Sequence, residues 1–185
     1  MAAGVRLFGE NRVQEAEAKV PQLLGARWHM VGHLQANKAA RAVALFEVVH
    51  SLDSIALARR LDRLVVEAGR GPLGIYLQVN VDRDPAKEGL TPEETDAVLD
   101  EVVSLHGLDV RGLMTVGRLV ATEAEARSTF ASLHELSTRL RAGQLGLGNG
   151  LSMGMSDDFE IAVEEGATVV RIGRALFGER PPSGC

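Results

Sequence analysis

Short apolar runs alternate with longer amphipathic segments along almost the whole chain, and this alternation constrains the fold more than any other feature. Seven runs are rich in β-branched and other apolar residues, which is typical of strands: residues 5–9, 27–32, 47–52, 74–81, 110–116, 150–155 and 168–173. An uninterrupted order of strand and helix predicts a parallel α/β sheet covered by helices. Seven such units in one chain favour a (β/α)8 barrel of the TIM-barrel type over an open, doubly wound sheet.

Three of the intervening helical segments carry recognisable ends. Residues 54–69 have an apolar stripe and stop at Gly69, which is typical of a helix C-terminus. Thr91 and Glu94 are spaced as a capping box around Pro92, and Thr122 and Glu125 repeat that spacing. These signals predict helices that begin just after Thr91 and Thr122.

The composition narrows the function classes. With 45% hydrophobic residues and 24% charged residues in 185 positions, we expect one globular domain over residues 1–185, with a disordered tail at about 180–185. With a net charge of −5, the chain lacks the excess of positive charge that is typical of nucleic-acid-binding proteins. No apolar stretch is long enough for a membrane span. Because the N-terminus does not read as a signal peptide, we expect a cytoplasmic protein. Cys185 is the only cysteine, so the sequence predicts neither a disulfide nor a metal site.

In a barrel of this type the chemistry lies at the carboxyl ends of the strands, and phosphate commonly binds after the last two strands. In the stretch GLSMGMSDDFE, residues 150–160, period-two alternation predicts that Ser152, Gly154 and Ser156 share one face of a strand. Ser156, or a capping box from Asp157 to Glu160, would then begin the next helix. The hydroxyl and exposed amides there suit an oxyanion, although a plain helix cap accounts for the pattern equally well.

Arg171 lies inside an apolar strand, VVRIG. Alternation puts it on the face opposite Val170 and Ile172, so we expect its side chain to point into the mouth of the barrel. One interpretation is a structural ion pair with a neighbouring carboxylate. The other is that Arg171 holds a ligand atom that accepts a hydrogen bond, while the amides of Gly173 and Arg174 join Ser156 around a phosphate.

Four stretches together resemble the pyridoxal-phosphate homeostasis proteins, a family of single barrels similar to the barrel domain of alanine racemases. They are FGENRVQEA (8–16), WHMVGHLQANK (28–38), RGLMTV (111–116) and LSMGMSDDFEIAVEEGATVVRIGRALFG (151–178). The resemblance runs in order from residue 1 to about residue 180. It implies a barrel that binds pyridoxal 5'-phosphate for intracellular vitamin B6 homeostasis, without turnover and with no catalytic residue. It also implies that apo-enzymes dependent on this cofactor are partners.

The resemblance implies a role for each candidate residue. Arg171 would face the pyridine nitrogen of the cofactor, and Ser156, Gly173 and Arg174 would hold its phosphate. Position 174 is a threonine in many members. A contact through the main-chain amide would tolerate the arginine here, whereas loss of a contact through the threonine hydroxyl would lower the affinity. Asn11, His29 and Met114 are further candidates for cofactor contacts. Each has a structural alternative: Asn11 as a helix cap, His29 as a core histidine and Met114 as barrel filling.

Members of this family carry the lysine that binds the cofactor covalently on a first strand, in a segment like VAVSK. Nothing in this sequence matches that segment, so we expect a barrel that lacks its first βα unit and is open to self-association at its free edges. The three lysines are Lys19, Lys38 and Lys87, and we expect the latter two to be solvated near the barrel mouth.

Two alternatives to the homeostasis function follow. One is a truncated protein that binds the cofactor or phosphate noncovalently. The other is a racemase-like enzyme, for which no sequence remains to form the second domain that supplies an additional acid or base.

Overall fold

A computed structural model describes residues 4–117 and 122–178, and it contains seven strands in one parallel sheet. The predicted tail at 180–185 lies outside the described residues. Every predicted strand run contains a strand, with ends that shift by a few residues. The strands are β1 (Leu7–Glu10), β2 (Arg27–Met30), β3 (Val48–Leu52), β4 (Leu73–Gln78), β5 (Leu108–Met114), β6 (Gly150–Met155) and β7 (Val169–Arg171).

Seven α-helices alternate with the strands in the described part of the chain. They are α1 (Val13–Lys19), α2 (Ala39–Leu45), α3 (Ile55–Glu67), α4 (Pro92–Ser104), α5 (Glu123–Gly143), α6 (Phe159–Glu164) and α7 (Arg174–Phe177). Both predicted capping boxes are present, at Thr91 with Glu94 and at Thr122 with Glu125. Gly69 follows the end of α3 with a φ of 61°, a conformation that glycine adopts at little cost. No helix among the described residues is both long and apolar enough to cross a membrane.

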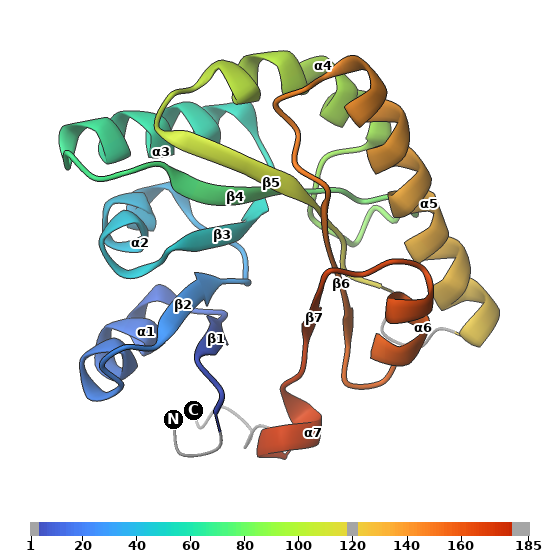
Figure 1. The fold of residues 1–185 in the computed structure, drawn as a ribbon, viewed down its shortest axis with the longest axis horizontal. Helices are drawn as coiled ribbons and strands as arrows, with labels where there is room; N and C mark the ends of the chain where they lie inside the picture. The colour runs from blue at the N-terminus through green and yellow to red at the C-terminus, as the bar shows by residue number, and fades with distance from the viewer. Residues whose placement is uncertain (1–3, 118–121, 179–185) are drawn as a thin grey trace.

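The strands pair in chain order from β1 to β7, which makes β1 and β7 the two ends of the sheet. Figure 1 shows this sheet curving into an incomplete ring with the helices α1 to α6 on its outer side. Within the described residues β7 does not pair with β1. The barrel prediction is therefore confirmed, with seven strands and two free edges.

Two separate apolar clusters hold the fold together. The larger one lies between the sheet and the outer helices and includes the fully buried Phe46, Leu61 and Phe130. The smaller one lies on the inner face, where Val48, Tyr76 and Met114 pack with Val116 and Val169. Since so few apolar side chains fill the interior, it has room for the polar side chains that make up the candidate site.

Candidate functional site

Arg171 on β7 points into the barrel, as strand alternation predicts. Its Nη1 donates to the hydroxyl and to the main-chain carbonyl of Ser152, both at 3.0 Å, and its Nη2 donates to the carbonyl of Thr115 at 2.9 Å. These bonds join the last three strands through one guanidinium. They leave Nε–H and one Nη2–H without a partner among the described residues, so the fork can still donate to a ligand.

The charge of Arg171 makes no salt bridge within residues 4–117 and 122–178, so the structural ion pair does not form. Burial lowers the pKa of Arg171 to about 10, and the carboxylate of Asp158 acts in the opposite direction. The guanidinium therefore stays protonated at neutral pH. A partly buried cation held only by neutral acceptors favours a ligand that accepts hydrogen bonds.

Two histidines extend this network across the interior. His50 Nδ1 lies 2.8 Å from the Ser152 hydroxyl, and His50 Nε2 lies 2.9 Å from Nδ1 of His29. The ring of His50 also stacks on Tyr76, with 4.5 Å between ring centroids. His50 is not among the residues predicted from the sequence, although a polar residue inside the apolar run VVHSL is the same signal that singled out Arg171.

Burial keeps both histidines neutral. Burial and then the charges of Arg27 and Arg111 lower the pKa of His29 to about 4. Burial and then His29, with Arg171 and Arg111, lower the pKa of His50 to about 3. Because both rings are neutral, each can pass a hydrogen bond along the chain from Arg171 through Ser152 to His29.

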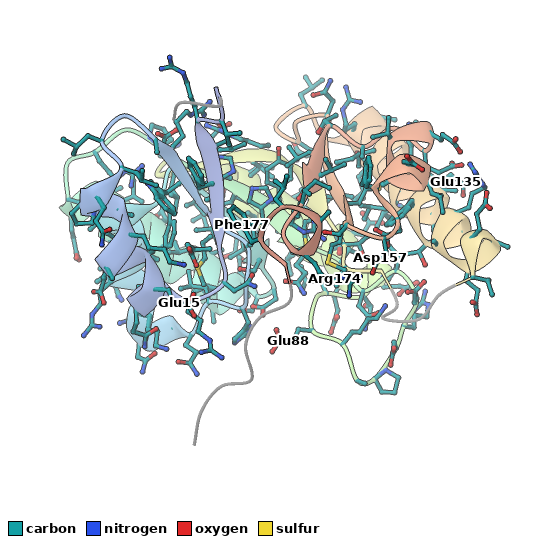
Figure 2. All side chains as sticks on the ribbon, turned by 90° about the horizontal axis from the view of Figure 1, so that it is seen from below. Glu15, Glu88, Glu135, Asp157, Arg174 and Phe177 are labelled. Carbon is teal, nitrogen blue, oxygen red and sulfur yellow. The ribbon has the colours of Figure 1, made fainter. Side chains whose placement is uncertain are left out.

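The three residues predicted to hold a phosphate come together at the start of α7. The Ser156 hydroxyl accepts a hydrogen bond from the amide of Ala175 at 3.2 Å. Gly173 precedes the helix, and Arg174 is its first residue. Figure 2 shows the side chain of Arg174 beside Asp157, with which it forms an ion pair. The hydroxyl and the first amides of α7 thus face one small region.

The expected helix cap at Ser156 or Asp157 is wrong. Helix α6 begins at Phe159, and its N-terminal residue Asp158 makes no side-chain cap. Instead, the Asp158 carboxylate accepts from the amide of Met155 at 2.6 Å, which closes a turn before the helix. This turn releases Ser156 from α6 and leaves its hydroxyl to α7.

The expected small face of β6 is also interrupted. Gly154 has a φ of 90°, and a Cβ there would lie 2.5 Å from the side chain of Ala162 on α6. The pairing of β6 with β7 shifts register between Ser152 and Met155. Gly154 therefore turns toward the outer helix, while Ser152 faces the interior.

The remaining sequence candidates occupy different surroundings. Met114 is buried in the inner apolar cluster, and His29 lies at the far end of the hydrogen-bonded chain from Arg171. Asn11 is exposed just after β1, and among the described residues its side chain is not a hydrogen-bond partner of Arg171 or Ser156. Its alternative as a helix cap is absent too, because α1 begins after Arg12.

The lysines have partners that the sequence did not indicate. Lys87 was expected to be solvated, but its side chain is only 18% exposed. Its ammonium lies 3.0 Å from the Asp82 carboxylate and 3.1 Å from the carbonyl of Val116. Lys19 pairs with Glu10 at 2.7 Å, and Lys38 lies in a short 3-10 turn. No lysine in the described chain lies on a strand.

Comparison with known proteins places this geometry in a family. Residues 1–181 match the family described as "Alanine racemase, N-terminal domain". A pyridoxal phosphate homeostasis protein of Pseudomonas aeruginosa is 46% identical over 181 residues, which cover 97% of this chain and 76% of that protein. A protein of the same name from Synechocystis is 40% identical over 182 residues, with coverage of 96% and 83%.

Solved structures agree with the sequence matches. PipY of Synechococcus elongatus, solved with PLP bound, has a TM-score of 0.88 and 44% identity, and the match covers 96% of this chain and 84% of that one. An alanine racemase of Clostridium difficile shares the fold, with a TM-score of 0.77 at 15% identity over 97% of this chain and 49% of that one. The match over residues 1–181 and the similarity to these relatives show that the chain belongs to the alanine racemase N-terminal domain family, among the pyridoxal phosphate homeostasis proteins.

Proposed function

We propose that the chain binds pyridoxal 5'-phosphate in the mouth of the barrel and acts in pyridoxal phosphate homeostasis, the role in the names of its relatives. The observation that carries this proposal is the partly buried guanidinium of Arg171, which retains N–H donors beside the region of Ser156 and α7. A protein with PLP bound, PipY, supports it at 44% identity.

Arg171 would donate a hydrogen bond to the ring nitrogen of the cofactor. The pKa of this guanidinium is about 10, so at neutral pH it donates a hydrogen bond without giving up its proton. When bound, pyridoxal phosphate supplies an aldehyde and a ring that withdraws electrons. A ring nitrogen that accepts a hydrogen bond but no proton withdraws them weakly, so the arrangement favours binding of the cofactor over carbanion chemistry.

Ser156, Gly173 and Arg174 would hold the phosphate. The Ser156 oxygen accepts from Ala175, so its own hydroxyl proton remains available to donate to a phosphate. The main-chain amides of Gly173 and Arg174 stand at the first turn of α7, where backbone N–H groups have no partner within a helix. Asp157 pairs with the Arg174 side chain, so we assign the contact at position 174 to the amide.

Calorimetric titration with pyridoxal phosphate and, separately, with inorganic phosphate tests the assignment. Ser156→Ala should weaken both by about 0.5–1.5 kcal/mol, the net value of one neutral hydrogen bond. Ser104→Ala is the matched control, because the Ser104 hydroxyl donates to the carbonyl of Glu101 within α4, at the other end of the barrel. Equal affinities in the wild type and Ser156→Ala would remove Ser156 from the site.

Arg171→Lys separates the two halves of the proposed site. It keeps a positive charge but loses the planar fork that bonds Ser152 and Thr115 at once. The affinity for pyridoxal phosphate should fall. The affinity for inorganic phosphate at Ser156 should stay within about twofold of the wild-type value, because no hydrogen bond worth about 0.5 kcal/mol or more is lost there. An unchanged affinity for pyridoxal phosphate would contradict the role of Arg171.

Other parts of the proposal rest on the resemblance alone. Asn11, His29 and Met114 are proposed as further cofactor contacts, and Arg174→Ala should be nearly neutral if only its amide is used. A cytoplasmic location and apo-enzymes as recipients of the cofactor also stay predictions. Transfer to an apo-enzyme is measurable as recovery of that enzyme's activity after addition of the loaded protein.

A further inference from the structure

Three side chains converge at the carboxyl ends of β2, β3 and β4, outside the proposed cofactor contacts. His33 follows β2, Asp53 follows β3, and Glu88 lies in the loop after β4. His33 Nδ1 lies 3.1 Å from an oxygen of Asp53 and 3.1 Å from an oxygen of Glu88. The three ligand atoms all lie within 4.8 Å of one another, so the group is compact enough to be a candidate metal site.

The distances suit a shared metal ion. One Nδ1 faces two carboxylates, and a single N–H that is aligned with one oxygen is not aligned with the other. With metal–ligand bonds of about 2.1 Å and angles between about 90° and 109°, neighbouring ligand atoms lie about 3.0–3.4 Å apart. The separations of 3.1 Å fall inside that range.

The main chain before His33 is held in place. A Cβ on Gly32 would lie 2.4 Å from the carbonyl oxygen of Asn11, so only glycine allows this approach of the β1 loop. The Ser51 hydroxyl donates to the carbonyl of Gly32 at 2.6 Å, which ties the β2 loop to β3. His33 is therefore positioned by two neighbouring strands.

The two carboxylates are anchored as well. Asp53 lies between the end of β3 and Ser54, whose hydroxyl accepts from the amide of Leu57 at the start of α3. The carbonyl of Glu88 accepts from the Gln78 side chain at 3.1 Å. Because the main chain at all three positions is fixed by bonds that do not involve these side chains, their convergence is built into the barrel.

We propose that His33, Asp53 and Glu88 form a binding site for a borderline divalent cation such as Zn²⁺. One imidazole nitrogen and two carboxylate oxygens are ligands that suit zinc and other first-row divalent metals. The ion would balance two adjacent negative charges. The side chains of His33 and Glu88 are 42% and 57% exposed, which leaves positions on the ion open to water or to a ligand. The sequence predicted no metal site, because these residues lie 20 and 35 positions apart.

Calorimetry with Zn²⁺ as the only added ligand tests the proposal on the full 185-residue chain. We expect one ion per chain. Loss of a group that merely orients a metal ligand costs ten- to a hundredfold in affinity, so His33→Gln, Asp53→Asn and Glu88→Gln should each weaken binding at least tenfold. The same titrations on a Cys185→Ser background remove the thiol as a competing ligand.

Two control variants remove similar groups elsewhere. His106→Gln changes an exposed histidine in the loop before β5, at the opposite end of the barrel. Glu135→Gln changes a carboxylate on α5 that lies far from Glu88 in Figure 2. Both should bind zinc like the wild type.

A second measurement uses Co²⁺, whose visible absorption reports its ligands. Binding should produce absorption bands that His33→Gln weakens or shifts and that His106→Gln leaves unchanged. Absence of zinc binding would mean that His33 only contacts the two carboxylates directly, and it would overturn the proposal. Binding that survives in all three site variants, or that falls equally in the controls, would overturn it too. None of these readouts depends on pyridoxal phosphate.

Discussion

Acidification from pH 7 to pH 5 should destabilise the barrel, because His29 and His50 are buried in the neutral form. His29 is 7% exposed and has a pKa of about 4, and His50 is 1% exposed and has a pKa of about 3. In the unfolded chain a histidine has its ordinary pKa of about 6.5. Since the folded values are depressed, the stability is fully present above pH 6.5 and is lost as the pH falls toward 4 and 3.

The magnitude follows from proton linkage. At pH 5 the unfolded chain binds almost one proton at each of these histidines, and the folded chain binds almost none. Integration from pH 7 to pH 5 gives a loss of about 2 kcal/mol for each histidine and roughly 4 kcal/mol for the pair. Such a loss is a large share of the free energy of unfolding of a typical domain.

Urea denaturation at the two pH values measures the loss, with the fluorescence of Trp28 as the probe. Trp28 is the only tryptophan, it is 4% exposed, and it packs against Phe8 with 5.2 Å between ring centroids. The variant His50→Gln should retain only about half of the pH-dependent loss, whatever its stability at pH 7. His106→Gln, which removes an exposed histidine, should retain all of it.

Two results would refute this reasoning. Equal free energies of unfolding at pH 7 and pH 5 would mean that the interior accepts the charged histidines, for example through water that reaches the ring nitrogens. A full loss in His50→Gln would mean that other groups carry the pH dependence. The slope of the free energy against urea concentration must stay constant for either comparison to hold.

Three further predictions concern the free edges, the lysines and β6. The chain should self-associate with increasing concentration in sedimentation experiments, and Leu7→Lys on the exposed edge strand β1 should reduce the self-association. A monomer at every concentration would contradict this prediction. Borohydride reduction after addition of stoichiometric pyridoxal phosphate should label no single lysine fully by mass spectrometry, because the Lys19 and Lys87 ammonium groups are held by carboxylates; stoichiometric labelling of one lysine would overturn that. Gly154→Ala should lower the free energy of unfolding by about 1–3 kcal/mol, since φ is 90° and Ala162 is in the way; Gly143→Ala, where a Cβ meets nothing within 4 Å, is the control and should be neutral or stabilising.

Local signals predicted the elements of this fold. The capping boxes at Thr91 and Thr122 formed because each needs only four consecutive residues, and the strands formed where β-branched runs were bounded by turn residues. Alternation was enough to aim Arg171 into the barrel, since β7 is regular over its short length. The parallel order then brought Ser156, Gly173 and Arg174 to one end of the sheet, as the sequence indicated.

The failures occurred where the backbone departs from regular geometry. Strand alternation assumed a regular β6, but the register shift and the left-handed Gly154 turned one residue of the small face outward. The cap expected at Ser156 lost to the turn that Asp158 closes with the Met155 amide. Both outcomes depend on how α6 packs against the sheet, which a sequence window of ten residues does not contain.

The hydrogen bonds that join residues of different strands could not be predicted from the sequence for a different reason. Arg171, Ser152, His50 and His29 come from four strands, and His50 and Ser152 are 102 positions apart in the chain. The sequence does show that His50 is a polar residue in an apolar strand, but the curvature of the sheet decides which strand faces it. Because a buried polar group needs a partner, each such residue in an apolar strand predicts another on a strand across the barrel. The pairing of His50 with Ser152 follows this rule. Among the described residues, the chain of hydrogen bonds ends at Nε2 of His29, which is buried and has no hydrogen-bond partner.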